Sequence, residues 1–179
     1  MIRRLLAIAL AAAVATPAFA ALKPGAPAPE FAAQATLGGK IYPFDLDAAL
    51  RKGPVVLYFF PAAFTSGCTI EAHEFADAID QYKALGATVL GVTAGNVDRL
   101  AEFSTSECRS KFPVLADPDL KIAKAYDSTL LIYPGHSGRT SYVIAPDHKI
   151  VFTYDDLNAA KHVELTLDAV RKWRAAHPG

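Results

Sequence analysis

The chain has 179 residues, of which 52% are hydrophobic, and its 18 Lys and Arg residues balance its 18 Asp and Glu residues. The hydrophobic content excludes a disordered chain, and the charge balance gives no electrostatic reason to bind nucleic acid or an anionic membrane. The length suits one domain with a full hydrophobic core.

The first twenty residues have the pattern of a secretory signal peptide. A charged start with Arg3 precedes an apolar stretch over residues 5–14, and Ala18-Phe19-Ala20 forms a small-x-small cleavage motif. A membrane anchor is the alternative, but the apolar stretch is too short to span a bilayer. We therefore expect cleavage after Ala20, a mature domain over residues 21–179, and an exported, periplasmic protein without a membrane span.

The start of the mature chain predicts an extended arm, a hairpin and a short helix. Three prolines keep residues 22–30 extended. Two strands are expected over residues 31–36 and 40–44, separated by a glycine pair typical of a hairpin turn. Asp45 is expected to cap a helix over residues 46–50.

The most informative stretch begins with Val55 to Phe60, an apolar run rich in β-branched and aromatic residues. Such a run predicts a strand buried on both faces. A helix is expected next, over residues 66–85, because apolar side chains recur at helical spacing at Ile70, Phe75, Ile79 and Tyr82. Cys68 therefore falls in the first helical turn after a central strand. The free N–H groups and the positive dipole end found there favour a thiolate, which is the nucleophilic form of cysteine.

The middle of the chain predicts another strand and two further helices. A buried strand is expected over residues 87–93, followed by a helix over residues 97–106 that Asn96 caps. Cys108 lies just after this helix. Pro118 is expected to open the next helix, over residues 119–126.

The last third of the chain predicts a loop, a hairpin and a final helix. Gly and Pro residues mark a loop over residues 130–139, and strands are expected over residues 141–145 and 150–154. The helix over residues 160–175 is expected to bury Val163, Leu167, Val170 and Trp173. This order of elements predicts a thioredoxin-like α/β fold, in which helices flank a central mixed β-sheet that carries an N-terminal β-hairpin. Sites in such sheets lie at the carboxyl ends of strands, where Cys68 falls.

Four stretches in the right order carry a resemblance to a known family. The apolar run from Val55 leads into the pattern Pro-x-x-x-Thr/Ser-x-x-Cys, which stands here as Pro61 to Cys68, and related stretches follow at Lys111–Asp117 and Gly138–Ile144. In these motifs the chain resembles a peroxiredoxin of the AhpC/TSA superfamily, and most of all the bacterioferritin comigratory protein or Q type. The resemblance implies a thioredoxin-dependent peroxidase for hydrogen peroxide and organic hydroperoxides. It implies a monomer or weak dimer that uses no cofactor or metal.

The residues around Cys68 fit the chemistry that this resemblance implies. The thiolate attacks one peroxide oxygen and the other leaves, so donors fixed along the O–O axis stabilise the transition state. Thr65 is expected to supply a hydroxyl and Arg139 a planar guanidinium. Pro61 is expected to shield the sulfur, and Glu71 to orient the arginine. The alternatives are a helix cap for Thr65, a solvated surface charge for Arg139 and dipole complementation for Glu71.

The second cysteine is expected to complete the reaction cycle. A sulfenic acid on Cys68 condenses with a second thiol, and Cys108 resembles the resolving cysteine of Q-type members that lies before a Phe-Pro stretch. The resemblance implies an intramolecular Cys68–Cys108 disulfide that forms with local unwinding and is reduced by a thioredoxin-like protein. A one-cysteine enzyme with a free Cys108 is an alternative, as is a permanent structural disulfide.

Three other functions compete with peroxide reduction. A thiol–disulfide exchange protein normally carries Cys-x-x-Cys, but the first position of that motif is Thr65 here. An exported copper-binding module would pair two cysteines with a histidine such as His136, but only Cys68 lies in the active-site loop. A non-catalytic scaffold would not be expected to combine Thr65, Cys68 and Arg139.

Overall fold

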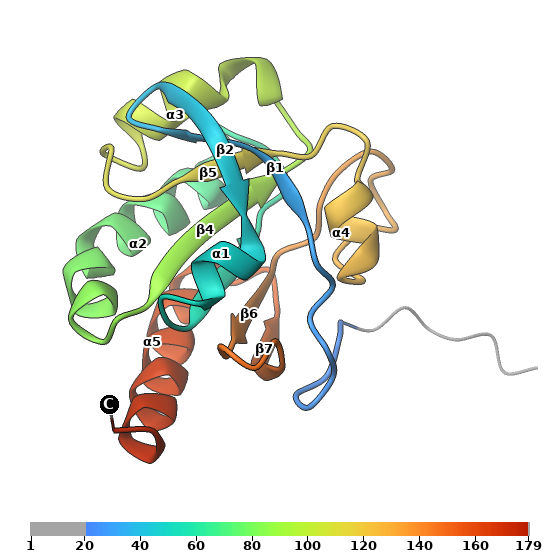
Figure 1. Cartoon of the computed structure of the whole chain (residues 1–179). Coiled ribbons are helices and arrows are strands. Elements are labelled where there is room, and N and C mark those ends of the chain that lie inside the picture. The colour runs from blue at the N-terminus through green and yellow to red at the C-terminus, as the bar shows by residue number, and fades with distance from the viewer. Residues whose placement is uncertain (1–20, 179) are drawn as a thin grey trace, which may run out of the picture.

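A seven-stranded mixed sheet forms the centre of this computed structural model, which describes residues 21–178 (Figure 1). The predicted signal peptide lies outside the described residues. The strand order is β2-β1-β5-β4-β3-β6-β7. The strands are β1 (Ala32–Leu37), β2 (Lys40–Asp45), β3 (Val55–Phe59), β4 (Thr88–Thr93), β5 (Val114–Ala116), β6 (Thr140–Ile144) and β7 (Ile150–Asp155). The predicted thioredoxin-like α/β fold with its N-terminal hairpin is confirmed.

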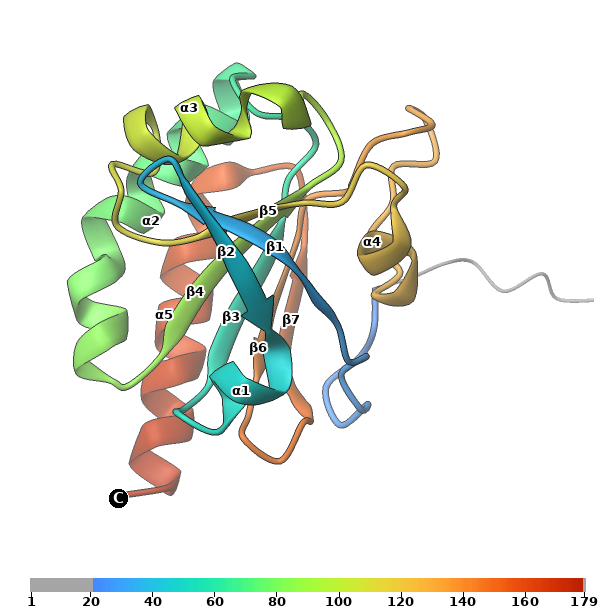
Figure 2. The same cartoon turned by 45° about the horizontal axis from the view of Figure 1, so that its top comes forward.

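Helices cover both faces of this sheet, as Figure 2 shows. The helices are α1 (Leu46–Leu50), α2 (Ser66–Ala84), α3 (Leu100–Ser106), α4 (Lys121–Ala125) and α5 (Ala159–Ala176), with a 3₁₀ turn, η1 (Val97–Arg99), before α3. Side chains from α2, α3 and α5 share one core, and those from α1 and α4 share the other. Within residues 21–178, no helix has both the length and the apolar character needed to cross a membrane.

Strand β3 holds the two cores together because its side chains alternate between them. Val56 and Tyr58 pack in the core of α2 and α5, whereas Val55, Leu57 and Phe59 pack in the opposite core. All five residues of the strand are buried, as predicted. Packing on both faces therefore fixes the position of β3, which ends at Phe59, a few residues before α2 begins at Ser66.

Strand β5 was not predicted as a strand, and it connects the hairpin to the rest of the sheet. It pairs in parallel with β4 at Gly91↔Val114 and antiparallel with β1 at Thr36↔Val114. Its three residues are too few to show a period, and Pro113 directly before them suits a strand end or a loop equally well.

One predicted helix cap and one predicted helix start are wrong. Asn96 makes no side-chain cap; its backbone is left-handed (φ 54°), and its side-chain amide donates to the Ala63 carbonyl oxygen at 2.8 Å, so it holds the active-site loop instead. The helix expected from residue 119 begins at Lys121, after Leu120 in a left-handed conformation (φ 56°). Its first turn is held by Asp117, whose carboxylate accepts from the Ala123 N–H at 2.8 Å.

Two apolar side chains expected in the core lie outside it. Ile70 is 51% exposed because its position in α2 faces away from the sheet. Trp173 is half-buried and stacks on His177 near the end of α5, with ring centroids 4.6 Å apart. The other expected contacts hold: Phe75, Ile79 and Tyr82 of α2, and Val163, Leu167 and Val170 of α5, are buried.

Candidate active site

Cys68 lies in the first turn of α2, directly behind the carboxyl end of β3, as predicted. The loop between them is held by hydrogen bonds to the segment after β4, where the Ala63 N–H donates to the Gly95 carbonyl oxygen at 3.2 Å. Phe64 turns the chain into the helix through a left-handed conformation (φ 63°), which is costly for a bulky residue. Cys68 is 1% exposed, so water is largely excluded from the thiol.

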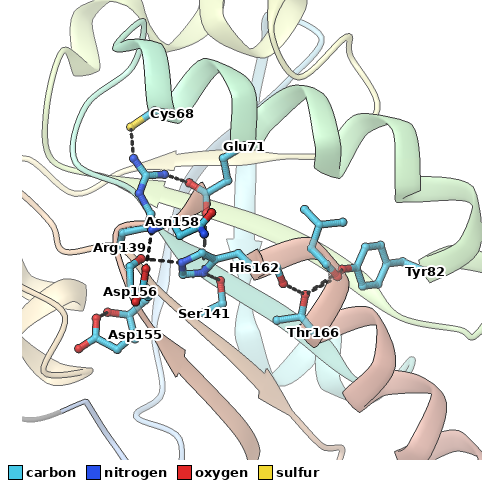
Figure 3. A network of polar contacts seen from close by, with 12 residues as sticks. Cys68, Glu71, Tyr82, Arg139, Ser141, Asp155, Asp156, Asn158, His162 and Thr166 are labelled. Carbon is cyan, nitrogen blue, oxygen red and sulfur yellow. Dashed lines mark hydrogen bonds and ion pairs between the residues drawn. The ribbon is translucent and has the colours of Figure 1, made fainter. Parts of the chain in front are cut away.

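Arg139 reaches Cys68 from a neighbouring strand. It directly precedes β6, whose Thr140 pairs with Phe59 at the end of β3, so antiparallel pairing puts Arg139 beside the active-site loop. Its Nη2 lies 3.3 Å from the Cys68 sulfur (Figure 3). The guanidinium is 6% exposed, so it is not the solvated surface charge of the alternative interpretation.

Glu71 holds the other side of the guanidinium. It lies one turn after Cys68 on the same face of α2, and its Oε2 pairs with Arg139 Nη1. Burial raises the pKa of Glu71 to about 8, against the opposing effect of Arg139. Burial also opposes the charge on Arg139, but Glu71 and Cys68 outweigh it and raise the arginine pKa, so the guanidinium stays charged.

A buried histidine from the last helix completes the cluster, and the sequence analysis missed it. His162 on α5 is fully buried, and its Nδ1 lies 3.8 Å from Glu71 Oε1. Its Nδ1 is 2.7 Å from Ser141 Oγ, and its Nε2 is 2.8 Å from the Asp156 carbonyl oxygen. Burial lowers the pKa of His162, and the charge of Arg139 acts in the same direction. The sequence did carry one signal for this residue: His162 stands beside Val163 on the apolar face of a helix whose other face exposes charged side chains.

Thr65 and Pro61 lie in the active-site loop. Among the hydrogen bonds of residues 21–178, none joins either of them to the Cys68 sulfur. Thr65 is exposed at the N-cap position of α2, and its hydroxyl donates to the Ala62 carbonyl oxygen at 3.1 Å rather than to the helix. The side-chain cap offered as its alternative role is therefore not formed. Pro61 is half-buried, and its carbonyl oxygen accepts from Thr93 Oγ1 at 3.3 Å.

Cys108 is fully buried and, like Cys68, is a free thiol in this structure. Burial, with a contribution from Glu107, raises its pKa well above the usual range. The segment that carries it is fastened to α2 by two ion pairs. Glu107 lies 2.8 Å from His73, and Arg109 pairs with Asp77.

The described part of the chain offers no preformed metal site. Residues 21–178 contain no group of three or more His, Cys, Asp or Glu side chains placed to hold a metal ion. His136, the ligand considered for copper, lies in the loop before β6.

A cysteine at the start of a helix, held against a buried arginine on a thioredoxin-like fold, defines the class of thiol-dependent peroxidases. The AhpC/TSA family model matches residues 24–153, and the chain belongs to this family, the peroxiredoxins. It is 31% identical over 147 residues to MT2597 of Mycobacterium tuberculosis, which carries a peroxiredoxin name, covering 79% of this chain and 90% of that protein. It is 29% identical over 124 residues to peroxiredoxin Bcp of Escherichia coli, covering 66% and 78%.

A solved structure agrees with these relatives. Peroxidoxin BcpB from Mycobacterium tuberculosis superposes with a TM-score of 0.75 at 28% identity, covering 84% of this chain and 97% of that one. The resemblance to the bacterioferritin comigratory and Q types therefore agrees with the names of relatives that are 28–31% identical to this chain.

Proposed function

We propose that the protein reduces hydrogen peroxide and organic hydroperoxides at Cys68, with Cys108 as the resolving cysteine. The contact between Arg139 Nη2 and the Cys68 sulfur, 3.3 Å long and shielded from water, is the observation that carries this proposal. A permanent positive charge at that distance stabilises the thiolate and the negative charge that develops on the peroxide oxygens.

The first step makes one S–O bond and breaks the O–O bond. The thiolate of Cys68 attacks the peroxide oxygen that bears hydrogen, the alkoxide or hydroxide leaves, and a proton completes the alcohol or water. Arg139 donates to the oxygens, and the exposed hydroxyl of Thr65 turns from the Ala62 carbonyl oxygen toward the substrate. Pro61 keeps the loop stiff and the sulfur shielded from water.

In the second step the Cys68 sulfenic acid condenses with the Cys108 thiol, giving a disulfide and water. Both sulfurs are buried and separate, so the segment around Cys108 must leave its place. Two features favour that release. Arg109 and Ser110 both have left-handed backbones (φ 50° and 55°), each costing about 1–2 kcal/mol, and the ion pair of Arg109 with Asp77 of α2 is solvent-exposed and weak.

The rest of the cycle follows from the family and the N-terminal pattern. A thioredoxin-like protein reduces the disulfide by thiol exchange, and the enzyme works as an exported, periplasmic monomer or weak dimer. Export separates it from cytoplasmic reductants, so its reductant belongs to the compartment that it enters.

Peroxide consumption and intact mass test both parts. With a generic dithiol as reductant, Cys68→Ser abolishes peroxide consumption, and undiminished activity in this variant contradicts the role of Cys68. With one equivalent of peroxide and no reductant, the native protein loses two hydrogens. A gain of one or two oxygens instead contradicts the resolving role of Cys108, and Cys108→Ser serves as the matched control because it must show that gain.

A one-cysteine cycle is the second candidate, and one observation favours it. The Cys108 thiol is fully buried and has a raised pKa, so it does not ionise in the folded state. If the segment around it stays folded, an outside thiol must reduce the Cys68 sulfenic acid directly. In that case native protein and Cys108→Ser consume peroxide at the same rate with any dithiol.

A further inference from the structure

Arg139 is shared by two buried acids. One terminal nitrogen of its guanidinium faces the Cys68 sulfur and the other pairs with Glu71 Oε2 (Figure 3). The exposed fraction is 1% for Cys68, 0% for Glu71 and 6% for Arg139. One buried cation balances one anion, whereas two ionised neighbours would leave an uncompensated negative charge that is costly to bury.

His162 shows which oxygen of Glu71 can hold a proton. The carbonyl oxygen of Asp156 can only accept, so His162 Nε2 carries hydrogen toward it at 2.8 Å. A neutral His162 then has a bare Nδ1, which accepts from the Ser141 hydroxyl at 2.7 Å. No hydrogen of His162 therefore points at Glu71 Oε1, which has no hydrogen-bond partner among the described residues. A proton on Oε1 would therefore meet no opposing hydrogen from His162, whose Nδ1 lies 3.8 Å away.

We propose that Cys68 and Glu71 share one negative charge across Arg139: Glu71 keeps a proton on Oε1 while Cys68 is a thiolate, and releases it when Cys68 becomes neutral. His162 is the positioning residue that keeps its own protons away from Oε1. The inference rests on the proposed reaction at Cys68. It gives Glu71 a role beyond orienting the arginine.

The reaction balances without a change in buried charge. A Cys68 thiolate, a protonated Glu71 and a hydroperoxide give a Cys68 sulfenic acid, an ionised Glu71 and an alcohol. The S–O bond forms, the O–O bond breaks, sulfur is oxidised and the peroxide is reduced. Glu71 releases one proton to solvent, and the leaving alkoxide takes up one proton from solvent. Arg139 keeps one anionic partner before and after the step.

The titration of Glu71 depends on every charged or titratable group that faces it. Burial raises the pKa of Glu71 to about 8; Glu74 acts in the same direction and Arg139 in the opposite one. The groups around Glu71 come from four parts of the fold: Cys68 and Glu74 on α2, Tyr58 on β3, Arg139 before β6, and His162 on α5. Tyr58 stays neutral because burial raises its pKa well above 10, so Cys68 is the group whose charge changes in the reaction.

The test follows the Glu71 carboxyl carbon by nuclear magnetic resonance in protein labelled with ¹³C at glutamate. Glu71→Gln assigns the signal by removing it. In Cys68→Ser, Arg139 has Glu71 as its only anionic partner. We therefore expect the carboxyl of Glu71 to bind its proton about tenfold more weakly than in the reduced native protein, so that its titration midpoint falls by about one pH unit. Cys68→Ala repeats the comparison in case the serine hydroxyl binds Arg139. The Glu102 signal is the matched control, because Glu102 is exposed on α3 and pairs with Arg99 rather than with Arg139.

The result decides between charge sharing and mere orientation. A fall in proton affinity of about threefold or more in both Cys68 variants, with Glu102 unchanged, supports the proposal, and any smaller change overturns it. Peroxide consumption by the native sample is measured alongside. If the native protein consumes peroxide and the Glu71 titration does not move, only this inference fails. A native protein that consumes no peroxide contradicts the proposed function, whatever the titration shows.

Discussion

Replacing Arg139 with lysine keeps the positive charge but removes the planar fork that contacts Cys68 and Glu71 together. At the 3.3 Å between Nη2 and the sulfur, two unit charges attract by about 5 kcal/mol at an effective dielectric constant of about 20. A lysine ammonium is a single charged centre without the second arm of the fork, and at roughly 6 Å from the sulfur its attraction is about 3 kcal/mol. The difference of about 2 kcal/mol corresponds to a roughly 30-fold slower reaction with peroxide.

Stopped-flow measurement of the second-order rate constant with hydrogen peroxide checks this prediction. Arg139→Met, which removes the charge, should be slower still, by about a thousandfold in total. Arg171→Lys is the matched control, because Arg171 is exposed and contacts the Gln81 amide at 2.7 Å on the outer side of the same helices. An Arg139→Lys enzyme within threefold of the native rate would refute the reasoning, since it would show that the two-sided contact is not needed.

Three further predictions concern stability and the active-site loop. Gly91→Ala should lower the free energy of unfolding in urea by about 2–3 kcal/mol, because a Cβ there would lie 2.8 Å from the ring and hydroxyl of buried Tyr58; a change below about 0.5 kcal/mol would contradict it. The carboxyl of Glu71 has an ordinary pKa of 4.5 but about 8 in the fold, so it binds its proton more tightly when folded. Stability should therefore fall by roughly 2–4 kcal/mol as the pH rises from 4.5 to 8, and Glu71→Gln should remove that slope in urea titrations. Thr65→Val should slow peroxide reduction about 10- to 100-fold while changing stability by less than about 1 kcal/mol, and a native rate would show that the hydroxyl is not a donor to the substrate.

Local chemistry explains why much of the site could be predicted from the sequence. Cys68 and Glu71 lie on one helical face, so their spacing alone placed them together. Arg139 precedes a strand, and the motif around it indicated a place beside the same loop. In the structure Arg139 Nη2 lies 3.3 Å from the Cys68 sulfur, and Arg139 pairs with Glu71.

The parts that sequence reasoning missed depend on long-range packing. His162 meets Glu71 only because α5 packs beside α2 on the same face of the sheet, and no local pattern encodes that contact. Asn96 suited a helix cap by its residue type, but a tertiary contact with Ala63 took its side chain. The strand β5 is recognisable only through its partners β1 and β4, because three residues carry no period of their own.

The arrangement around Arg139 also sets when the nucleophile becomes reactive during synthesis. Arg139 is made 71 residues after Cys68, and His162 later still. At about 5–20 residues per second, the ribosome needs roughly 4–14 s to cover that first interval alone. Until β6 and α5 are in place, the growing chain offers oxidants only an ordinary thiol. Reactivity toward peroxide is thus among the last properties the polypeptide acquires, which protects an incomplete chain from oxidation at the residue it needs most.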